Sequence, residues 1–72
     1  MSKEIVRIKD GENYITLNVL LKLTNIISTG GQAKYYLQEN EVFVNDVLEN
    51  RRGRKLYPGD LVKVEGKEFE IK

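Results

Sequence analysis

The sequence of 72 residues contains no cysteine, no histidine and no tryptophan. Without thiols it forms no disulfide, and without imidazole it lacks the side chain that most often serves as a general base. Zinc prefers sulfur and nitrogen ligands, so we expect no metal site, and nothing in the sequence predicts a cofactor. Aliphatic runs reach only three residues, as at 19–21, which predicts neither a membrane span nor a signal peptide. We therefore expect a cytoplasmic protein without a membrane partner.

Candidate catalytic residues are equally scarce. A nucleophile would have to be a Ser, Thr, Tyr or Lys, and no activating base stands beside one. The eleven carboxylates mostly alternate with Lys or Arg on predicted strand faces, as solvated charges do, although a carboxylate pair for acid/base work stays open. We expect no enzyme, no catalytic residue and no small-molecule substrate.

Neither sign of charge predominates, because twelve Lys and Arg are balanced by eleven Asp and Glu, which leaves a net charge of +1. The length has room for one small hydrophobic core, so we expect a single domain over residues 1–72. A near-neutral sum does not by itself favour nucleic acid as a partner. Local clusters decide that question, because a net charge is a sum over regions.

Hydrophobic periodicity predicts a strand and then two helices. Residues 3–9 alternate as a strand and end in a turn at 10–13. Apolar residues at helical spacing predict a helix over 17–24, capped by Thr16, with Leu23 on its widened apolar face. A second helix is predicted to begin at the capping-box pattern of residues 29–32, with the Thr29 hydroxyl as its cap.

After the second helix the period changes to two residues. Residues 42–44 and 47–48 flank Asn-Asp, which predicts a tight hairpin, and Tyr-Pro-Gly-Asp at 57–60 predicts a type II turn. Strands are predicted over 61–65 and through Phe69 and Ile71. The order predicts an α+β fold, in which two helices pack on one side of a small, mostly antiparallel sheet of about four to five short strands.

The sharpest feature is the basic stretch Arg-Arg-Gly-Arg-Lys at residues 51–55. Cations this close repel one another, and an anionic partner would relieve that cost. Arginine also offers planar donors that suit phosphates and bases, so the stretch is a candidate nucleic-acid contact. The alternative is a solvated loop balanced by acidic residues, namely Glu39, Glu41, Asp46 and Glu49.

The start of the second helix is a weaker candidate. Glycines let a phosphate approach the unpaired N–H groups of a helix start, and Lys34 would add a charge about one turn in. The alternative is that Gly30 and Gly31 only shape the link between the helices. Tyr35 is predicted to be exposed, either as a stacking partner for a base or without a specific role, while Tyr57 is predicted to pack at its turn.

Three motifs together resemble the S-four RNA-binding domain, named after ribosomal small-subunit protein four. They are Thr-Gly-Gly-Gln-Ala-Lys at 29–34, Val-Phe-Val-Asn at 42–45 and Arg-Lys-Leu-Tyr-Pro-Gly-Asp at 54–60, and the match covers about residues 15–65. The chain is most similar to the short stand-alone, YaaA-type members found in Gram-positive bacteria. The resemblance implies the helical and hairpin core called the alpha-L motif.

The resemblance further implies structured RNA, ribosomal or transfer RNA, as the partner, with a role in ribosome assembly or translation and ribosomal proteins as further candidates. Combined with the residue patterns, it gives the expected RNA-binding set: Thr29, Gly30, Gly31, Gln32, Lys34, Tyr35, Asn45, Arg51, Arg52, Arg54 and Lys55.

The sequence departs from the family pattern at three positions. Gly30 and Gly31 stand where the family commonly has Arg, and Asp46 replaces the usual hairpin Gly. These changes remove two phosphate contacts and add a negative charge. The alternative hypothesis is therefore a protein-interaction module that has lost RNA binding.

Overall fold

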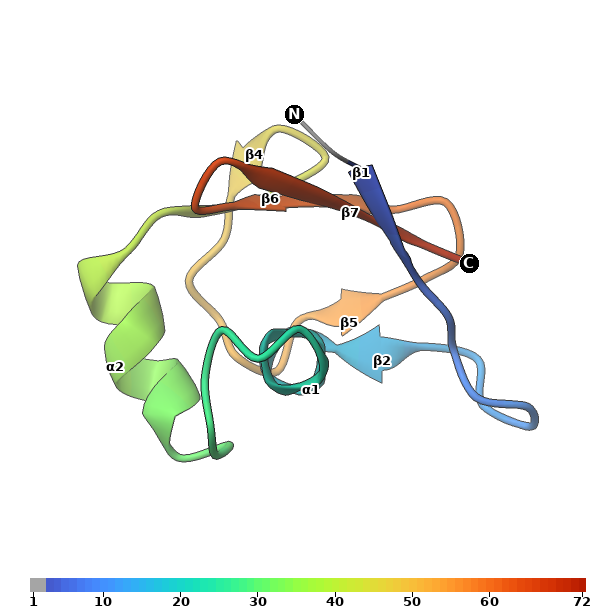
Figure 1. Cartoon of the computed structure of the whole chain (residues 1–72), viewed down its shortest axis with the longest axis horizontal. Helices are drawn as coiled ribbons and strands as arrows, with labels where there is room; N and C mark the ends of the chain where they lie inside the picture. The colour runs from blue at the N-terminus through green and yellow to red at the C-terminus, as the bar shows by residue number, and fades with distance from the viewer. Residues whose placement is uncertain (1–2) are drawn as a thin grey trace.

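A computed structural model describes residues 3–72 of the chain, in two layers (Figure 1). In chain order, the elements are β1 (Lys3–Val6), β2 (Ile15–Thr16), α1 (Leu17–Leu23), α2 (Gln32–Glu39), β3 (Val42–Val44), β4 (Val47–Leu48), β5 (Lys55–Leu56), β6 (Leu61–Val64) and β7 (Lys67–Ile71). One layer is a five-stranded sheet, and the other holds the two helices with the short β2–β5 pair.

The larger sheet has the strand order β1-β7-β6-β3-β4. The first and last strands are neighbours in it, because β1 runs parallel to β7 with Val6 opposite Ile71. The other neighbours are antiparallel, with Val62 opposite both Val44 and Phe69. The predicted α+β class and mostly antiparallel sheet are therefore confirmed.

The hydrophobic core lies between the two layers. Alternate sheet residues point into it, and the apolar faces of both helices close it from the other side. Its largest fully buried side chains are Phe69, Leu17, Leu20, Leu21, Leu56, Ile71, Val42, Val44, Val62 and Val64. Ala33 and Leu37 are the buried residues of α2, so this face of the helix packs on the core.

The predicted turns have the backbone conformations that their residues favour. Asn45 and Asp46 both adopt positive φ, 53° and 67°, which fits the twist of a tight hairpin. Gly59 has a φ of 98° and follows Pro58, as a type II turn requires. The Asp60 N–H donates to the Tyr57 carbonyl oxygen at 3.0 Å and closes this turn.

Several local predictions need correction. The first strand ends at residue 6 instead of 9. Leu23, predicted on the apolar face of its helix, is the last residue of α1 and is 56% exposed. Neither Thr16 nor Thr29 caps a helix through its hydroxyl. The pairing of β2 with β5 was not predicted at all. Neither helix in residues 3–72 has the length and apolar character that crossing a membrane requires.

Candidate nucleic-acid interface

The backbone of the basic stretch is tied to the start of α1. β2 pairs with β5, and the same register continues beyond them: the Leu17 N–H donates to the Arg54 carbonyl oxygen at 2.9 Å. The Asn18 N–H likewise donates to the Arg52 carbonyl oxygen at 3.0 Å. Carbonyl oxygens therefore satisfy N–H groups that a helix start leaves unpaired. The loop is held at two points, which fixes where its basic side chains emerge.

Glu49 forms ion pairs with two of the four cations in the basic stretch. It follows β4, where its N–H donates to the Val42 carbonyl oxygen at 2.8 Å, and only 6% of the residue is exposed. Its carboxylate accepts from Arg51 Nε at 3.0 Å and from Arg54 Nη1 at 2.7 Å. These two arginines therefore already have an anionic partner within the chain. Of the acidic residues named in the alternative of a balanced loop, Glu49 therefore pairs with two of the four cations.

The hydrogen bond from Arg51 is the main reason that the pKa of Glu49 falls from 4.5 to about 2. The bond from Arg54 and the neighbouring positive charge act in the same direction, while burial opposes them. A carboxyl whose pKa is lower in the folded than in the unfolded chain stabilises the fold above its unfolded pKa. That contribution is lost as the pH falls through the folded pKa.

We expect a Glu49→Gln substitution to lower the free energy of unfolding by about 2 kcal/mol at pH 7, since the amide cannot replace the charged pairs. The difference from the unsubstituted chain should shrink between pH 4.5 and about 2, where Glu49 itself becomes protonated. Urea unfolding followed by circular dichroism at several pH values measures this. Glu41→Gln, at an exposed position, is the matched control. A difference that stayed constant down to pH 2 would contradict the role given to the Glu49 charge.

Two other cations line a groove between α2 and the chain after β4. Lys34 and Arg52 stand on its walls, and it encloses about 660 Å³. Within residues 3–72, no carboxylate forms an ion pair with either of them. The lining also contains apolar, amide and acidic side chains, namely Leu37, Gln38, Glu39, Asn40, Glu41, Leu48 and Asn50. The groove joins the two segments that were predicted separately as RNA contacts.

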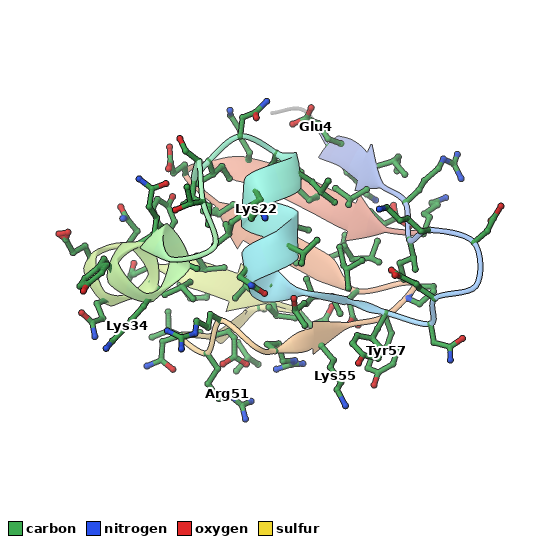
Figure 2. All side chains as sticks on the ribbon, turned by 90° about the horizontal axis from the view of Figure 1, so that it is seen from below. Glu4, Lys22, Lys34, Arg51, Lys55 and Tyr57 are labelled. Atoms are coloured by element: carbon green, nitrogen blue, oxygen red, sulfur yellow. The ribbon has the colours of Figure 1, made fainter. Side chains whose placement is uncertain are left out.

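The basic surface continues beyond the groove. Arg51, Arg54 and Lys55 line a neighbouring hollow together with Tyr57. Figure 2 shows Lys34, Arg51, Lys55 and Tyr57 projecting along one edge of the molecule, below α1 in that view. We call this surface the basic edge, and define it by Lys34, Arg51, Arg52, Arg54 and Lys55. Its members come from α2, the loop before β5 and the start of β5. The fold therefore gathers positive charges on one edge, although the net charge of the whole chain is only +1.

The start of α2 is organised by Gln32. Its Oε1 accepts from the N–H groups of Ser28 and Thr29 at 2.6 and 3.1 Å, which is one half of the predicted capping box. The N–H groups of Gln32 and Ala33 donate to carbonyl oxygens of residues 29 and 30. These four N–H groups are already paired within the chain, which narrows the predicted phosphate site to the glycine segment.

Sequence reasoning missed Lys22. It is exposed on the last turn of α1, and a Cβ built on Gly30 would meet the Lys22 Cδ at 4.0 Å and Asn18 Nδ2 at 3.9 Å. A positive charge therefore lies beside the segment where Gly30 and Gly31 replace the arginines of the family pattern. The i, i+4 spacing from Asn18 to Lys22 places both on one helix face, but only the structure brings that face to the glycines.

Both polar atoms of the Asn45 side chain form hydrogen bonds within the fold. Its Oδ1 accepts from the Leu61 N–H at 3.0 Å, and its Nδ2 donates to Asp60 Oδ1 at 3.1 Å. The side chain thus ties the hairpin tip to the Pro-Gly turn. The neighbouring Asp46 forms an ion pair with Lys63 at 3.0 Å, so the negative charge added at the hairpin has a partner on β6.

The two adjacent tyrosines of α2 differ in exposure, and Tyr35 is exposed as predicted. Tyr35 is 64% exposed, whereas Tyr36 is half-buried and packs against the core. The Tyr36 hydroxyl donates to Glu65. The pKa of the phenol is raised, mainly by burial and to a smaller extent by this hydrogen bond. Tyr36 therefore fastens α2 to the β6–β7 turn, which leaves Tyr35 as the accessible ring.

Two helices pack against a mostly antiparallel sheet, and this includes the helical and hairpin core that the family resemblance implied. A model of the S4 domain family matches residues 6–72. The chain therefore belongs to the S4 domain family, the S-four domain of the sequence analysis.

A relative from Bacillus subtilis (strain 168) is named "Probable ribosome maturation protein RlbA". It is 60% identical to this chain over 52 residues, a stretch that spans 72% of this chain and 73% of the relative. The predicted similarity to a small member of the family is thereby confirmed.

Proposed function

We propose that the chain is a non-catalytic, ribosome-related RNA-binding protein that contacts structured ribosomal RNA through the basic edge. Membership of the S4 domain family and the name of the Bacillus subtilis relative support a ribosome-related role. The observation that carries the proposal is that cations from α2 and from residues 51–55 lie along one edge. Such a role would imply a cytoplasmic location.

The basic edge suits an RNA backbone better than a set of bases. Lysine and arginine side chains on an open surface bind phosphates by charge, and phosphate contacts carry no sequence information. Lys34 and Arg52 both line the groove, so both would be within reach of the phosphates of an RNA strand inserted there. Glu49 holds Arg51 and Arg54 in fixed positions, which lowers the entropy lost when they bind. The RNA would thus be recognised by the spacing of its phosphates.

The second candidate function is a protein-interaction module. It is favoured by β4 at the edge of the larger sheet, where Val47 and Leu48 are 64% and 57% exposed. An exposed apolar edge strand is a template for pairing with another chain. Capture of a partner protein that persists after nuclease treatment would support this candidate.

Binding of the purified chain to fragments of ribosomal RNA, measured as salt is raised, tests the proposed function. We expect binding at low salt that weakens as salt increases, because phosphate contacts release counterions.

A further inference from the structure

We propose that Tyr14 and Tyr57 form a stacking platform for an unpaired nucleotide of the bound RNA, beside the phosphate contacts of the basic edge. The proposal rests on the proposed function and extends it: the RNA partner would carry a single-stranded nucleotide next to a structured segment.

The platform follows from the register of the β2–β5 pair. Ile15 lies opposite Leu56, and both are buried. Because side chains alternate across a strand, the residues on either side of this pair point outward. Extending the register by one residue brings Tyr14 opposite Tyr57 on the outer face. Their rings have centroids 5.8 Å apart and planes inclined by 53°.

Both rings are accessible, since Tyr14 is 38% and Tyr57 is 47% exposed. This corrects the prediction that Tyr57 only packs at its turn. Lys55, which shares the outer face, places its Nζ 5.1 Å from the centroid of the Tyr14 ring. The exposed ring surface offers a base a stacking partner, and the cation over the Tyr14 ring offers the nucleotide's phosphate a counter-charge.

The platform is held before any ligand arrives. The Tyr57 N–H donates to Asp60 Oδ2 at 2.8 Å, and Pro58 and Gly59 complete the turn between these residues. Tyr57 thus starts from a held backbone and Tyr14 packs beside it, so the pair loses little freedom when a base stacks on it. This distinguishes the pair from Tyr35, which stands alone on α2.

The surrounding charges favour an anion. Arg51, Arg54 and Lys55 line the same hollow as Tyr57, with Asp60 as its acidic member. The Asp60 carboxylate already accepts from the Tyr57 N–H and from Asn45 Nδ2, so its charge is partly satisfied. Glu12 lines a different hollow, which it shares with Tyr14. The net positive balance on the Tyr57 side directs the nucleotide's phosphate toward Lys55.

Two RNAs separate this proposal from the proposed function. They share one hairpin of ribosomal sequence, and one of them carries a short single-stranded overhang. We expect the unsubstituted chain to bind the overhang RNA about 10-fold more tightly than the blunt hairpin at the same salt concentration, near the lower end of measured base–aromatic stacking effects. A Tyr14→Ala/Tyr57→Ala variant should bind both equally, whereas Tyr14→Phe/Tyr57→Phe should keep the preference. Equal affinities of the unsubstituted chain for both RNAs would overturn the platform, while failure to bind either would overturn the proposed function.

A second measurement does not depend on the alanine variant being folded. The sequence contains no tryptophan, so a Tyr57→Trp substitution places a single tryptophan, read by its own fluorescence, within the platform. Stacking predicts that the overhang RNA quenches this fluorescence more than the blunt hairpin does. The same quenching by both RNAs, or by neither while both bind, would overturn the proposal and favour a protein contact for the two rings.

Discussion

A Lys34→Glu/Arg52→Glu variant is expected to bind structured RNA about 100-fold more weakly than the unsubstituted chain at low salt, because two attractive phosphate contacts become repulsive. Both side chains line the groove and lack ion-pair partners within residues 3–72, so neither reversal breaks a salt bridge of that part of the chain. The slope of log affinity against log salt should also become shallower by about two. Fluorescence anisotropy with a labelled ribosomal RNA fragment measures both effects.

The matched control is Arg7→Glu/Lys67→Glu, which changes the net charge by the same amount. Both positions are exposed and lie outside the basic edge, Arg7 after β1 and Lys67 at the start of β7. The control is expected to weaken binding only a few-fold, through the overall field of the protein. If the two variants weakened binding equally, the basic edge would not be the contact surface.

A Gly30→Arg/Gly31→Arg variant is expected to act in the opposite direction and to tighten RNA binding about 10-fold or more at low salt. It would restore the two basic side chains that the family pattern commonly has, and each new phosphate contact should steepen the salt slope by almost one. The gain should be largest at low salt, because counterion release is the source of the added affinity.

The backbone permits these two substitutions. Gly31 has φ −67° and ψ −22°, an ordinary helical conformation, and Gly30 lies outside the left-handed region. A Cβ at Gly31 would meet nothing nearer than the Thr29 hydroxyl at 3.9 Å, and one at Gly30 would make only ordinary contacts with α1. Replacing glycine at such positions also restricts the unfolded chain, so the variant should be at least as stable as the unsubstituted protein.

Gly30→Gln/Gly31→Gln is the matched control, since it adds long polar side chains without charge. Its RNA affinity should stay within a few-fold of the unsubstituted chain. If the arginine variant bound no more tightly than the glutamine variant, the α1–α2 connection would lie outside the RNA contact.

Local patterns were sufficient to predict most of the fold. Asn45-Asp46 and Pro58-Gly59 have strong conformational preferences, so their turns could be placed from the sequence. The change of period after α2 predicted the run of short strands, because a half-buried strand alternates whatever its neighbours are. The parallel pairing of β1 with β7 is different in kind, since two-residue alternation does not specify which strand becomes the neighbour.

The candidate site was predictable in composition but not in its pairing. Residues 51–55 are recognisable as a basic segment, yet nothing in the sequence identifies Glu49, among the nearby acidic residues, as their ion-pair partner. Only burial beside β4 makes Glu49 the partner of Arg51 and Arg54. The same holds for Tyr14, which meets Tyr57 through a strand pair of only two residues each. Such contacts between distant segments depend on the fold and have no local signal.

The most direct test of RNA binding through the basic edge is the affinity of the unsubstituted chain for a structured ribosomal RNA fragment between about 50 and 200 mM salt. Five cations define the edge and Glu49 offsets part of their charge, so about four phosphate contacts are expected. The predicted slope of log affinity against log salt is then about −3 to −4. A slope near zero, or no binding at the lowest salt, would contradict RNA binding through this surface.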